Sequence, residues 1–308
     1  MPKTHVARRI VINAPVAKVF EIMSNLNFWQ AWSPWLIMEP ECKVTVRQDN
    51  KYYEWEGKRI GSGNMLITSE KENESVAMDL VFLKPWKSKS KVRFELKPQA
   101  DVTEVNWYME GSLPFFMFWM ITMMENFIGM DFDRGLNLLK EYVEDGEVHS
   151  KLEFKGTSDF AHTKYVGIKS TCSMSELSEK MSQDFGRLGE WMTQNAELSD
   201  GKMFSIYHKW DMAKGTAVYT AALGANRIPD NLPMGFVTGE IPATKIITIR
   251  HIGPYHHLGN AWSTAFSMHR GKEFKPKKSI PPFELYVNTP MDTDSKALIT
   301  DINFAING

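Results

Sequence analysis

Two short stretches of the C-terminal half decide the fold: residues 204–207 read FSIY, and residues 283–286 read FELY. Other segments recur at nearly the same spacing, since the pair Thr163–Lys164 is followed about 80 residues later by the pair Thr244–Lys245. Segments that recur with almost constant spacing indicate a duplicated structural unit. We therefore expect two similar copies that face each other across a pseudo-twofold axis, with a cleft at that axis.

The two copies differ in charge at one matching position, because the second carries Glu284 where the first carries Ser205. Side chains alternate between the two faces of a strand, so Phe283 and Leu285 lie on one face and Glu284 on the other. If helices cover the Phe283 face, the opposite face stays open. That open face would present polar residues of both copies, namely Glu284, Tyr286, Ser205 and Tyr207.

A carboxylate among aromatic rings suits two kinds of chemistry. Charge pairing and cation–π attraction would together hold a lipophilic cation in a partly dry site. The same apolar setting would raise the pKa of Glu284, which suits a general acid or base. A third interpretation stays open at this point, namely a structural ion pair between Glu284 and a nearby Lys or Arg.

The composition is typical of a globular protein with two domains and no strong charge. The chain has 308 residues, of which 43% are hydrophobic and 24% are charged, and its formal net charge is −1 at pH 7. That length provides room for two cores, and the near-neutral charge predicts no direct binding to nucleic acid. The basic run from Lys84 to Lys97 alternates with apolar residues, so we interpret it as a hairpin with a solvated face.

The chain is also expected to be cytoplasmic and to lack a membrane span. Cys42 and Cys172 are the only cysteines and lie in different halves, which indicates no disulfide framework. The N-terminus enters a strand pattern rather than a signal peptide. The apolar run from Leu113 to Met124 is shorter than the roughly 20 residues of a spanning helix, so we interpret it as core.

The N-terminal half predicts an antiparallel sheet closed by a long helix. An alternating strand over residues 6–12 precedes a helical pattern, and a second short helical piece covers residues 27–33. Strand-like runs separated by turns then fill residues 44–110, as in a meander. A long helix with an apolar face over residues 128–143 ends at Gly146.

This order of elements, together with five motifs, resembles the START-type superfamily and its polyketide cyclase/dehydrase-like branch. The motifs are INAP at 12–15, WSPW at 32–35, GSG at 61–63, VNWYMEG at 105–111 and FDRGLNLLK at 132–140. The resemblance covers residues 1–146 and implies a helix-grip fold, in which an antiparallel sheet surrounds a long C-terminal helix and encloses a cavity. We interpret the aromatic and methionine residues of this half as core, some of them lining the cavity: Trp32, Trp35, Tyr53, Trp55, Met65, Phe82, Trp107, Met109 and Phe118.

The C-terminal half resembles a second family. After a connector at residues 147–158, each copy of the repeat reads strand, turn, strand, helix, strand, strand, and the copies cover about 152–225 and 234–308. The motifs that resemble the gyrase-inhibitor-like, or AraC-type effector-binding, domain are GPY at 253–255, FELY at 283–286 and TDI at 300–302. This resemblance covers residues 159–308 and implies a duplicated βαββ fold. The whole chain is thus predicted to be an α+β protein of two domains.

The second resemblance also implies which residues form a site. In effector-binding domains the matching glutamate meets bound ligand, and in some relatives it serves the hydrolysis of strained cyclopropane-containing toxins. Carried over to this chain, Glu284 is the principal ligand-binding residue, and Tyr255 and Trp262 are aromatic walls. We expect no metal, because neighbouring residues on a helix diverge by about 100°, so the rings of His256 and His257 do not converge. No cofactor is expected either.

Three functions remain open from the sequence. The leading hypothesis is a protein that binds small hydrophobic molecules, cations included, around Glu284, with a second cavity in the N-terminal domain. The first alternative is a hydrolase of strained or electrophilic small molecules with Glu284 as general acid or base, so whether the chain is an enzyme stays open. The second alternative is an interaction or inhibitor module with a protein partner.

Overall fold

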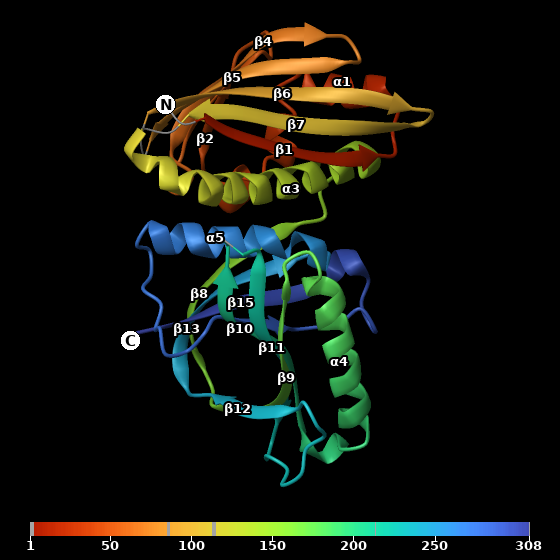
Figure 1. Ribbon diagram of the computed structural model, residues 1–308, viewed down its shortest axis with the longest axis vertical. Coiled ribbons are helices and arrows are strands. Elements are labelled where there is room, and N and C mark those ends of the chain that lie inside the picture. The colour runs from red at the N-terminus through yellow and green to blue at the C-terminus, as the bar shows by residue number, and fades with distance from the viewer. Residues whose placement is uncertain (1–2, 85–86, 113–114, 213, 308) are drawn as a thin grey trace. The chain divides into compact units, whose positions relative to one another are not determined.

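The structure is a computed structural model that describes residues 3–84, 87–112, 115–212 and 214–307. The chain divides into two compact units, residues 1–150 and 151–308, which we call the N-terminal and C-terminal domains (Figure 1). Each combines an antiparallel sheet with helices, as the predicted α+β class requires. Because β8 begins at Lys151, paired strand structure already occupies most of residues 147–158, the segment expected to be a connector.

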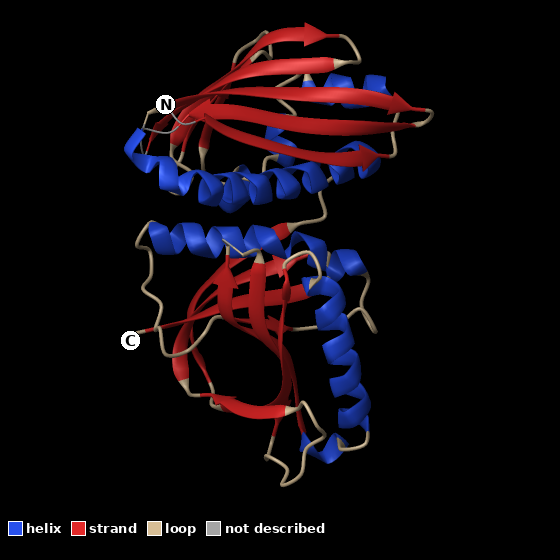
Figure 2. Cartoon of the chain, viewed as in Figure 1, coloured by secondary structure: helices blue, strands red, loops and turns tan. Residues whose placement is uncertain are grey.

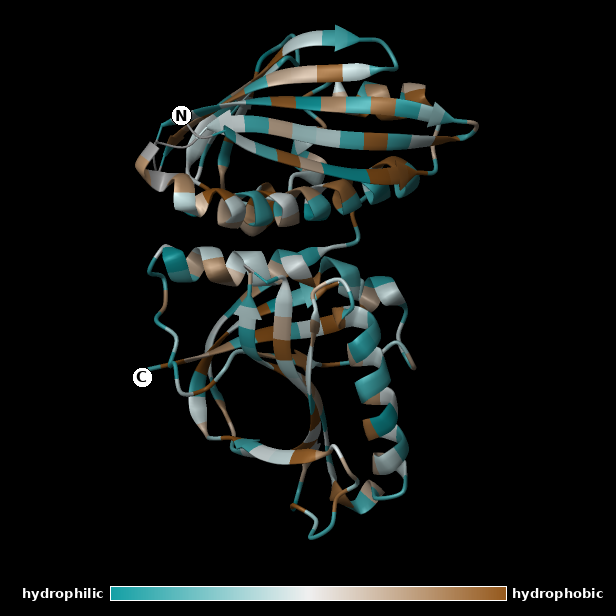
Figure 3. Ribbon diagram, viewed as in Figure 1, coloured by the Kyte–Doolittle hydropathy of each residue, from teal (hydrophilic) through white to brown (hydrophobic). Residues whose placement is uncertain are grey.

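Seven antiparallel strands form the N-terminal sheet in the order β1-β7-β6-β5-β4-β3-β2. Figure 2 shows the strands of this domain in red and its helices in blue. The strand bounds are β1 Lys3–Ile12, β2 Lys43–Val46, β3 Tyr52–Glu56, β4 Ser62–Lys71, β5 Ser75–Lys84, β6 Ser88–Gln99 and β7 Val102–Ser112. Hydrophobic and hydrophilic residues alternate along these strands (Figure 3), and in β6 this alternation buries Val92, Phe94 and Leu96. The predicted meander is therefore confirmed, and one face of the sheet is apolar.

A long helix covers that apolar face. The helical elements are α1 Val16–Met23, α2 Trp29–Trp32, η1 Leu36–Met38, η2 Phe115–Met120 and α3 Ile121–Asp145. The ring of Phe132 in α3 stacks on that of Trp107 in β7, with centroids 3.9 Å apart. Gly146, at φ 81°, ends the helix in the left-handed conformation that glycine adopts without steric cost.

The apolar run from Leu113 to Met124 is not core where the structure describes it, so that expectation is wrong. Phe116 is 74% exposed, Phe118 is 61% exposed and Trp119 is 68% exposed. Leu113 and Pro114 themselves lie outside the described residues. The described part of the run forms η2 and the first turn of α3, where the side chains of Phe116, Phe118 and Trp119 are exposed instead of packing into the core. Among the described residues, no helix is long and apolar enough to cross a bilayer.

Eight antiparallel strands form the C-terminal sheet in the order β12-β9-β11-β10-β14-β15-β13-β8. The strands are β8 Lys151–Phe160, β9 Thr163–Ser173, β10 Ser199–Asp211, β11 Thr216–Ala225, β12 Val237–Ile241, β13 Thr244–Ile252, β14 Phe283–Tyr286 and β15 Ile299–Ile306. The helical elements are α4 Leu177–Thr193, η3 Ala196–Leu198, η4 Tyr255–His257, α5 Leu258–Arg270 and η5 Ser295–Ala297. Each copy of the repeat thus contributes four strands and one main helix.

The two copies exchange their first strands. β8 belongs to the first copy but pairs with β13 of the second, whereas β12 belongs to the second copy but pairs with β9 of the first. The copies meet in the middle of the sheet, where β10 pairs with β14. Neither copy therefore completes its own sheet, and the pseudo-twofold axis runs between β10 and β14.

Candidate functional site

The asymmetric position of the repeat lies on the pseudo-twofold axis. In the β10–β14 ladder, Ser205 is directly opposite Glu284, and Ile206 is opposite Phe283. Ser205 and Glu284 are also the matching positions of the two FSIY and FELY motifs. A residue that pairs with its own counterpart marks the point where the axis crosses the sheet, so the single carboxylate sits at the centre of the domain.

The helices cover the face that carries Glu284, which corrects the expectation that they cover the Phe283 face. The indole of Trp262, from α5, donates a hydrogen bond to Glu284, and Met181 of α4 contacts Tyr286. On the other face, Phe283 belongs to a separate apolar cluster. Strand alternation correctly separates the two faces, but both faces of this sheet are buried, and alternation alone does not say which one receives the helices.

Glu284 is held by neutral donors inside the protein. It is 2% exposed; Trp262 Nε1 donates to its Oε1 over 2.6 Å, and the Tyr286 hydroxyl donates to its Oε2 over 2.6 Å. Since that hydroxyl proton is used, the Ser205 hydroxyl donates to the Tyr286 oxygen over 3.1 Å. Across the described part of the chain, no Lys or Arg forms an ion pair with Glu284. The geometry therefore does not support the interpretation of Glu284 as one half of a structural ion pair.

Burial dominates the electrostatics of this cluster. It raises the pKa of Glu284 above its ordinary value, and the hydrogen bonds from Tyr286, Trp262 and Tyr207 offset part of that rise. Burial also raises the pKa values of Tyr207 and Tyr286 well above 10, and the Glu284 charge raises them further. The phenols therefore remain protonated donors near neutral pH, while the carboxyl group is the one that can change charge.

Aromatic rings from several elements enclose the carboxylate. The Tyr207 and Trp262 ring centroids are 5.0 Å apart, those of Tyr255 and Tyr286 are 5.5 Å apart, and Trp210 stacks on Tyr207 at 4.8 Å. The structure thus brings together every residue that the sequence proposed for this site. Trp210 is an addition that strand alternation does not predict, because a residue three positions after Tyr207 falls on the opposite face of a regular strand. The irregularity in the β10–β11 ladder between Tyr207 and Lys209 changes that alternation.

Two of these aromatic residues carry polar atoms with no hydrogen-bond partner in the described structure. They are the Tyr255 hydroxyl and Trp210 Nε1, and both atoms are buried. Burial, with a smaller contribution from the Glu284 charge, raises the pKa of Tyr255 to about 12. Buried polar atoms without partners are uncommon in native proteins and call for an explanation, such as a ligand.

A second buried carboxylate, in the first copy, was missed from the sequence. Asp184 of α4 is fully buried and accepts hydrogen bonds from Ser170 over 2.6 Å and from Tyr219 over 2.8 Å. It differs from Glu284 because Lys180, one turn earlier, forms an ion pair with it at 2.5 Å. The sequence could have indicated this burial, because Asp184 stands three residues after Met181 and so lies on the apolar face of the helix.

The N-terminal domain contains a narrow apolar cavity. Its volume is about 50 Å³, and its lining residues include Trp35, Tyr53, Trp55, Phe82 and Trp107. The core interpretation holds for most of the aromatic and methionine residues named for this half: Trp32, Tyr53, Met65, Trp107 and Met109 are buried, and Trp35, Trp55 and Phe82 pack partly buried against them. It is wrong for Phe118, which is 61% exposed.

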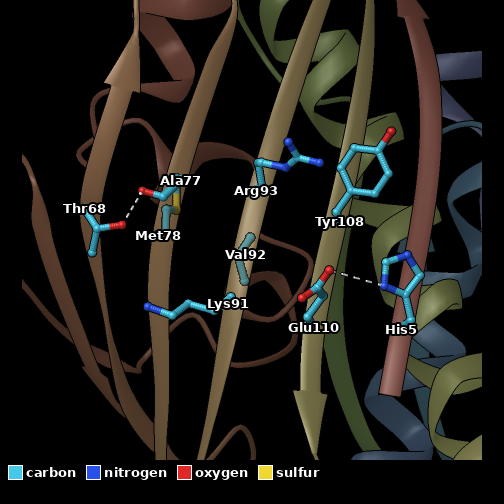
Figure 4. Close-up of a pocket in the computed structure, with 9 residues that line it drawn as sticks. All are labelled: His5, Thr68, Ala77, Met78, Lys91, Val92, Arg93, Tyr108 and Glu110. Carbon is cyan, nitrogen blue, oxygen red and sulfur yellow. Dashed lines mark hydrogen bonds and ion pairs between the residues drawn. The ribbon is translucent and has the colours of Figure 1, made fainter. Parts of the chain in front are cut away.

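A wider groove of about 410 Å³ crosses the outer face of the same sheet (Figure 4). Its charged groups already have partners, because His5 lies 3.7 Å from Glu110 and Lys91 lies 2.5 Å from Asp79. Arg93 similarly contacts Glu95 and lies over the Tyr108 ring. A site whose charges are neutralised at the protein surface attracts a ligand weakly, so this groove is a poor candidate compared with Glu284.

Comparison with known families agrees with both halves of the fold. A model described as a GyrI-like small molecule binding domain matches residues 158–307, and one described as polyketide cyclase / dehydrase and lipid transport matches residues 3–144. Fold and site thus define a protein made of two small-molecule binding domains. The chain carries an N-terminal polyketide cyclase-like (SRPBCC) domain and a C-terminal GyrI-like small-molecule binding domain, as the motifs implied.

Solved structures with similar folds share little sequence with this chain. The C-terminal domain of EcmrR is 18% identical, with 51% of this chain and 98% of that one covered and a TM-score of 0.41. The EcmrR–DNA complex is 15% identical, with 61% of this chain and 69% of that one covered and a TM-score of 0.42. The Aha1 dimer of Colwellia psychrerythraea is 16% identical, with 46% of this chain and 98% of that one covered and a TM-score of 0.36. No curated protein matches the sequence.

Proposed function

We propose that the C-terminal domain binds a small lipophilic cation at Glu284. The observation that carries this proposal is a carboxylate that is 2% exposed and whose hydrogen-bond donors, Trp262 and Tyr286, are both neutral. A buried charge without a counter-charge is unfavourable, so this group gains most from a ligand that brings a positive charge into the site. The proposal rests on the site geometry and on the GyrI-like description of the domain.

Binding requires the site to open. The Trp262 indole contacts Glu284 through Nε1, and its ring packs against Tyr207 at 5.0 Å and Phe266 at 5.7 Å. A cation that replaces this N–H would be surrounded by the rings of Tyr207, Tyr255 and Tyr286, which adds cation–π attraction to the charge pairing. Because only open molecules can bind, the apparent affinity equals the affinity of the open form multiplied by the fraction of molecules that are open.

The unpaired polar atoms refine the ligand class. The Tyr255 hydroxyl and Trp210 Nε1 are both donors without an acceptor in the described structure. A ligand with a hydrogen-bond acceptor beside its apolar body would satisfy one of them, whereas a pure hydrocarbon would leave both unpaired. We therefore infer that the preferred ligand carries a cationic group and a separate oxygen or nitrogen acceptor.

For the N-terminal cavity we propose a second, neutral ligand. Its lining is almost wholly apolar, but its volume of about 50 Å³ is far below the roughly 300–1,000 Å³ of ordinary ligand pockets. An apolar ligand would therefore need side chains such as Trp35 and Trp55, which are only partly buried, to move outward. The lipid-transport description of the matching family supports an apolar ligand here.

Calorimetric titration with tetraphenylphosphonium, and with an uncharged analogue of the same shape, tests the main proposal. We expect the wild type to bind the cation and Glu284→Gln to bind it at least about tenfold more weakly, because the charge pair is lost. Asp184→Asn is the matched control, since it removes a buried carboxylate that already has Lys180 as partner. Equal affinity for the cation in wild type and Glu284→Gln would exclude the proposal.

One observation favours the hydrolase as a second candidate function. The raised pKa of Glu284 suits a group that accepts a proton near neutral pH, and three phenol side chains stand beside it. Incubation with strained electrophilic substrates would test this, and equal rates for wild type and Glu284→Ala would remove Glu284 from the chemistry. The interaction-module alternative gains no support at this site, because a carboxylate that is 2% exposed cannot contact a partner surface.

A further inference from the structure

An exposed apolar stripe runs along the start of α3 in the N-terminal domain. Its residues recur every three or four positions and so lie on one helical side: Phe116 is 74% exposed, Trp119 68%, Met123 38%, Phe127 41% and Met130 41%. Phe118, 61% exposed, widens the stripe at its N-terminal end. The segment from Phe115 to Met124 contains no charged residue. Exposed apolar surface of this extent marks an interaction site.

Three lysines lie at the end of the sheet that is next in sequence to the start of this stripe. β7 ends at Ser112, three residues before η2, and Ser112 pairs with Lys3 of β1. The neighbouring strand β6 begins at Ser88, so Lys87 and Lys89 lie at the same end of the sheet. None of the described residues forms an ion pair with any of these three lysines. The η2 segment lies at this end of the domain in Figure 1.

The acidic groups near this end already have partners. Glu125 accepts a hydrogen bond from the His5 backbone over 2.8 Å, and Glu110 lies 3.7 Å from the His5 ring. Glu56 forms an ion pair with Lys84 at 3.3 Å. A backbone N–H carries no charge and His5 carries one only when protonated, so Glu125 and Glu110 both keep their negative charge. The three lysines still outnumber these two carboxylates, and the remaining charge at this end is positive.

We propose that η2 and the first turns of α3 dock the protein on an anionic phospholipid bilayer. Phe and Trp rings favour the boundary between headgroups and acyl chains, and unpaired lysines beside them are attracted by anionic headgroups. Phe116, Phe118 and Trp119 enter the boundary region, while Lys3, Lys87 and Lys89 contact the headgroups. The contact is peripheral, and it places the apolar cavity of the same domain next to a source of apolar ligands.

Vesicle co-sedimentation of the full chain tests the proposal. We expect binding to phosphatidylcholine vesicles that contain about 30 mol % phosphatidylglycerol, weaker binding to pure phosphatidylcholine, and a loss on raising the salt from about 50 to about 500 mM. We expect the triple variant Phe116→Ser/Phe118→Ser/Trp119→Ser to lower the partition coefficient between buffer and vesicles by about 100-fold. The double variant Lys87→Glu/Lys89→Glu should lower it by at least about 25-fold.

Matched controls lie on exposed positions of the C-terminal domain. Met234 and Met291 are each 96% exposed, so Met234→Ser/Met291→Ser removes apolar surface elsewhere; Lys275→Glu/Lys278→Glu makes the same charge change at exposed sites. Both controls are expected to bind like the wild type, and unchanged melting temperatures show that the substituted chains fold. The absence of vesicle binding, equal binding by the Ser variant and the wild type, or a stripe that instead drives self-association in sedimentation velocity would overturn the proposal.

Discussion

The Tyr286 hydroxyl provides the sharpest test of the Glu284 cluster. In Tyr286→Phe the ring stays, and with it the contacts to Phe185 and Tyr255, whose centroids lie 5.6 and 5.5 Å away. The hydroxyl is lost, together with its hydrogen bond to Glu284 over 2.6 Å and the one it accepts from Ser205 over 3.1 Å. The substitution thus changes hydrogen bonding with little change in packing.

The expected cost follows from those two bonds. A hydrogen bond to an ionisable group contributes roughly 1.5–3 kcal/mol, and a neutral one about 1 kcal/mol, so Tyr286→Phe should lower the free energy of unfolding by about 2–4 kcal/mol. The loss should appear only in the transition of the C-terminal domain, because Tyr286 lies in that unit. Cation affinity should also fall at a given pH near neutrality, since the Tyr286 hydrogen bond lowers the pKa of Glu284.

Urea denaturation followed by circular dichroism measures the first effect, and calorimetric titration measures the second. Tyr219→Phe is the matched control, because it removes a buried hydroxyl that donates to Asp184 over 2.8 Å. This control should destabilise the same domain and leave cation affinity unchanged. A Tyr286→Phe protein that loses less than about 1 kcal/mol would refute the hydrogen-bond network described around Glu284.

Four further predictions concern stability. The pKa of Glu284 is higher in the folded chain than in the unfolded one, so its contribution to stability is complete below about pH 4.5 and is lost as the pH rises through the folded value. Over that range the unfolding free energy of the wild type should therefore fall relative to that of Glu284→Gln, which cannot ionise at this position. Gly186→Ala in α4 should stabilise by about 0.5–1 kcal/mol, because nothing lies within 4 Å of the added carbon. Gly167→Ala should destabilise by about 1–3 kcal/mol, because the Ala221 carbonyl oxygen would lie 2.6 Å from the added Cβ. Chemical denaturation of both glycine variants measures these changes in unfolding free energy. Leu139→Ala, at a fully buried site, should cost about 2–5 kcal/mol and lower the melting temperature of the N-terminal domain alone.

The sequence predicted the element order well because local signals set it. The helix stop at Gly146 was readable because glycine adopts a left-handed conformation there, at φ 81°. The repeat was likewise enough to bring Glu284 and Ser205 together, since matching strands of two copies meet at a twofold axis. Motifs that depend on neighbours in the chain, or on symmetry between copies, are visible without a structure.

Properties that depend on packing between distant elements were not predicted. Which face of β14 receives the helices depends on how α4 and α5 return to the sheet, and no residue of the FELY motif carries that information. The exposure of Phe118 was also hidden, because an apolar run has the same composition whether it is buried or presented to a partner. Asp184 looked like one polar residue in a helix, since Ser170 and Tyr219 reach it from two other elements.

The position of Glu284 on the axis also restricts how this protein could have arisen. In a symmetric dimer of single repeats, the residue opposite Glu284 would be a second glutamate, and two buried carboxylates side by side would repel each other. Joining the copies in one chain removes that constraint, because each position can then diverge from its counterpart. Ser205 is the result: it leaves the charge single and supplies a hydroxyl that supports the Tyr286 donor. Gene fusion, rather than any change in the fold, is what allows one negative charge to occupy the centre of a twofold architecture.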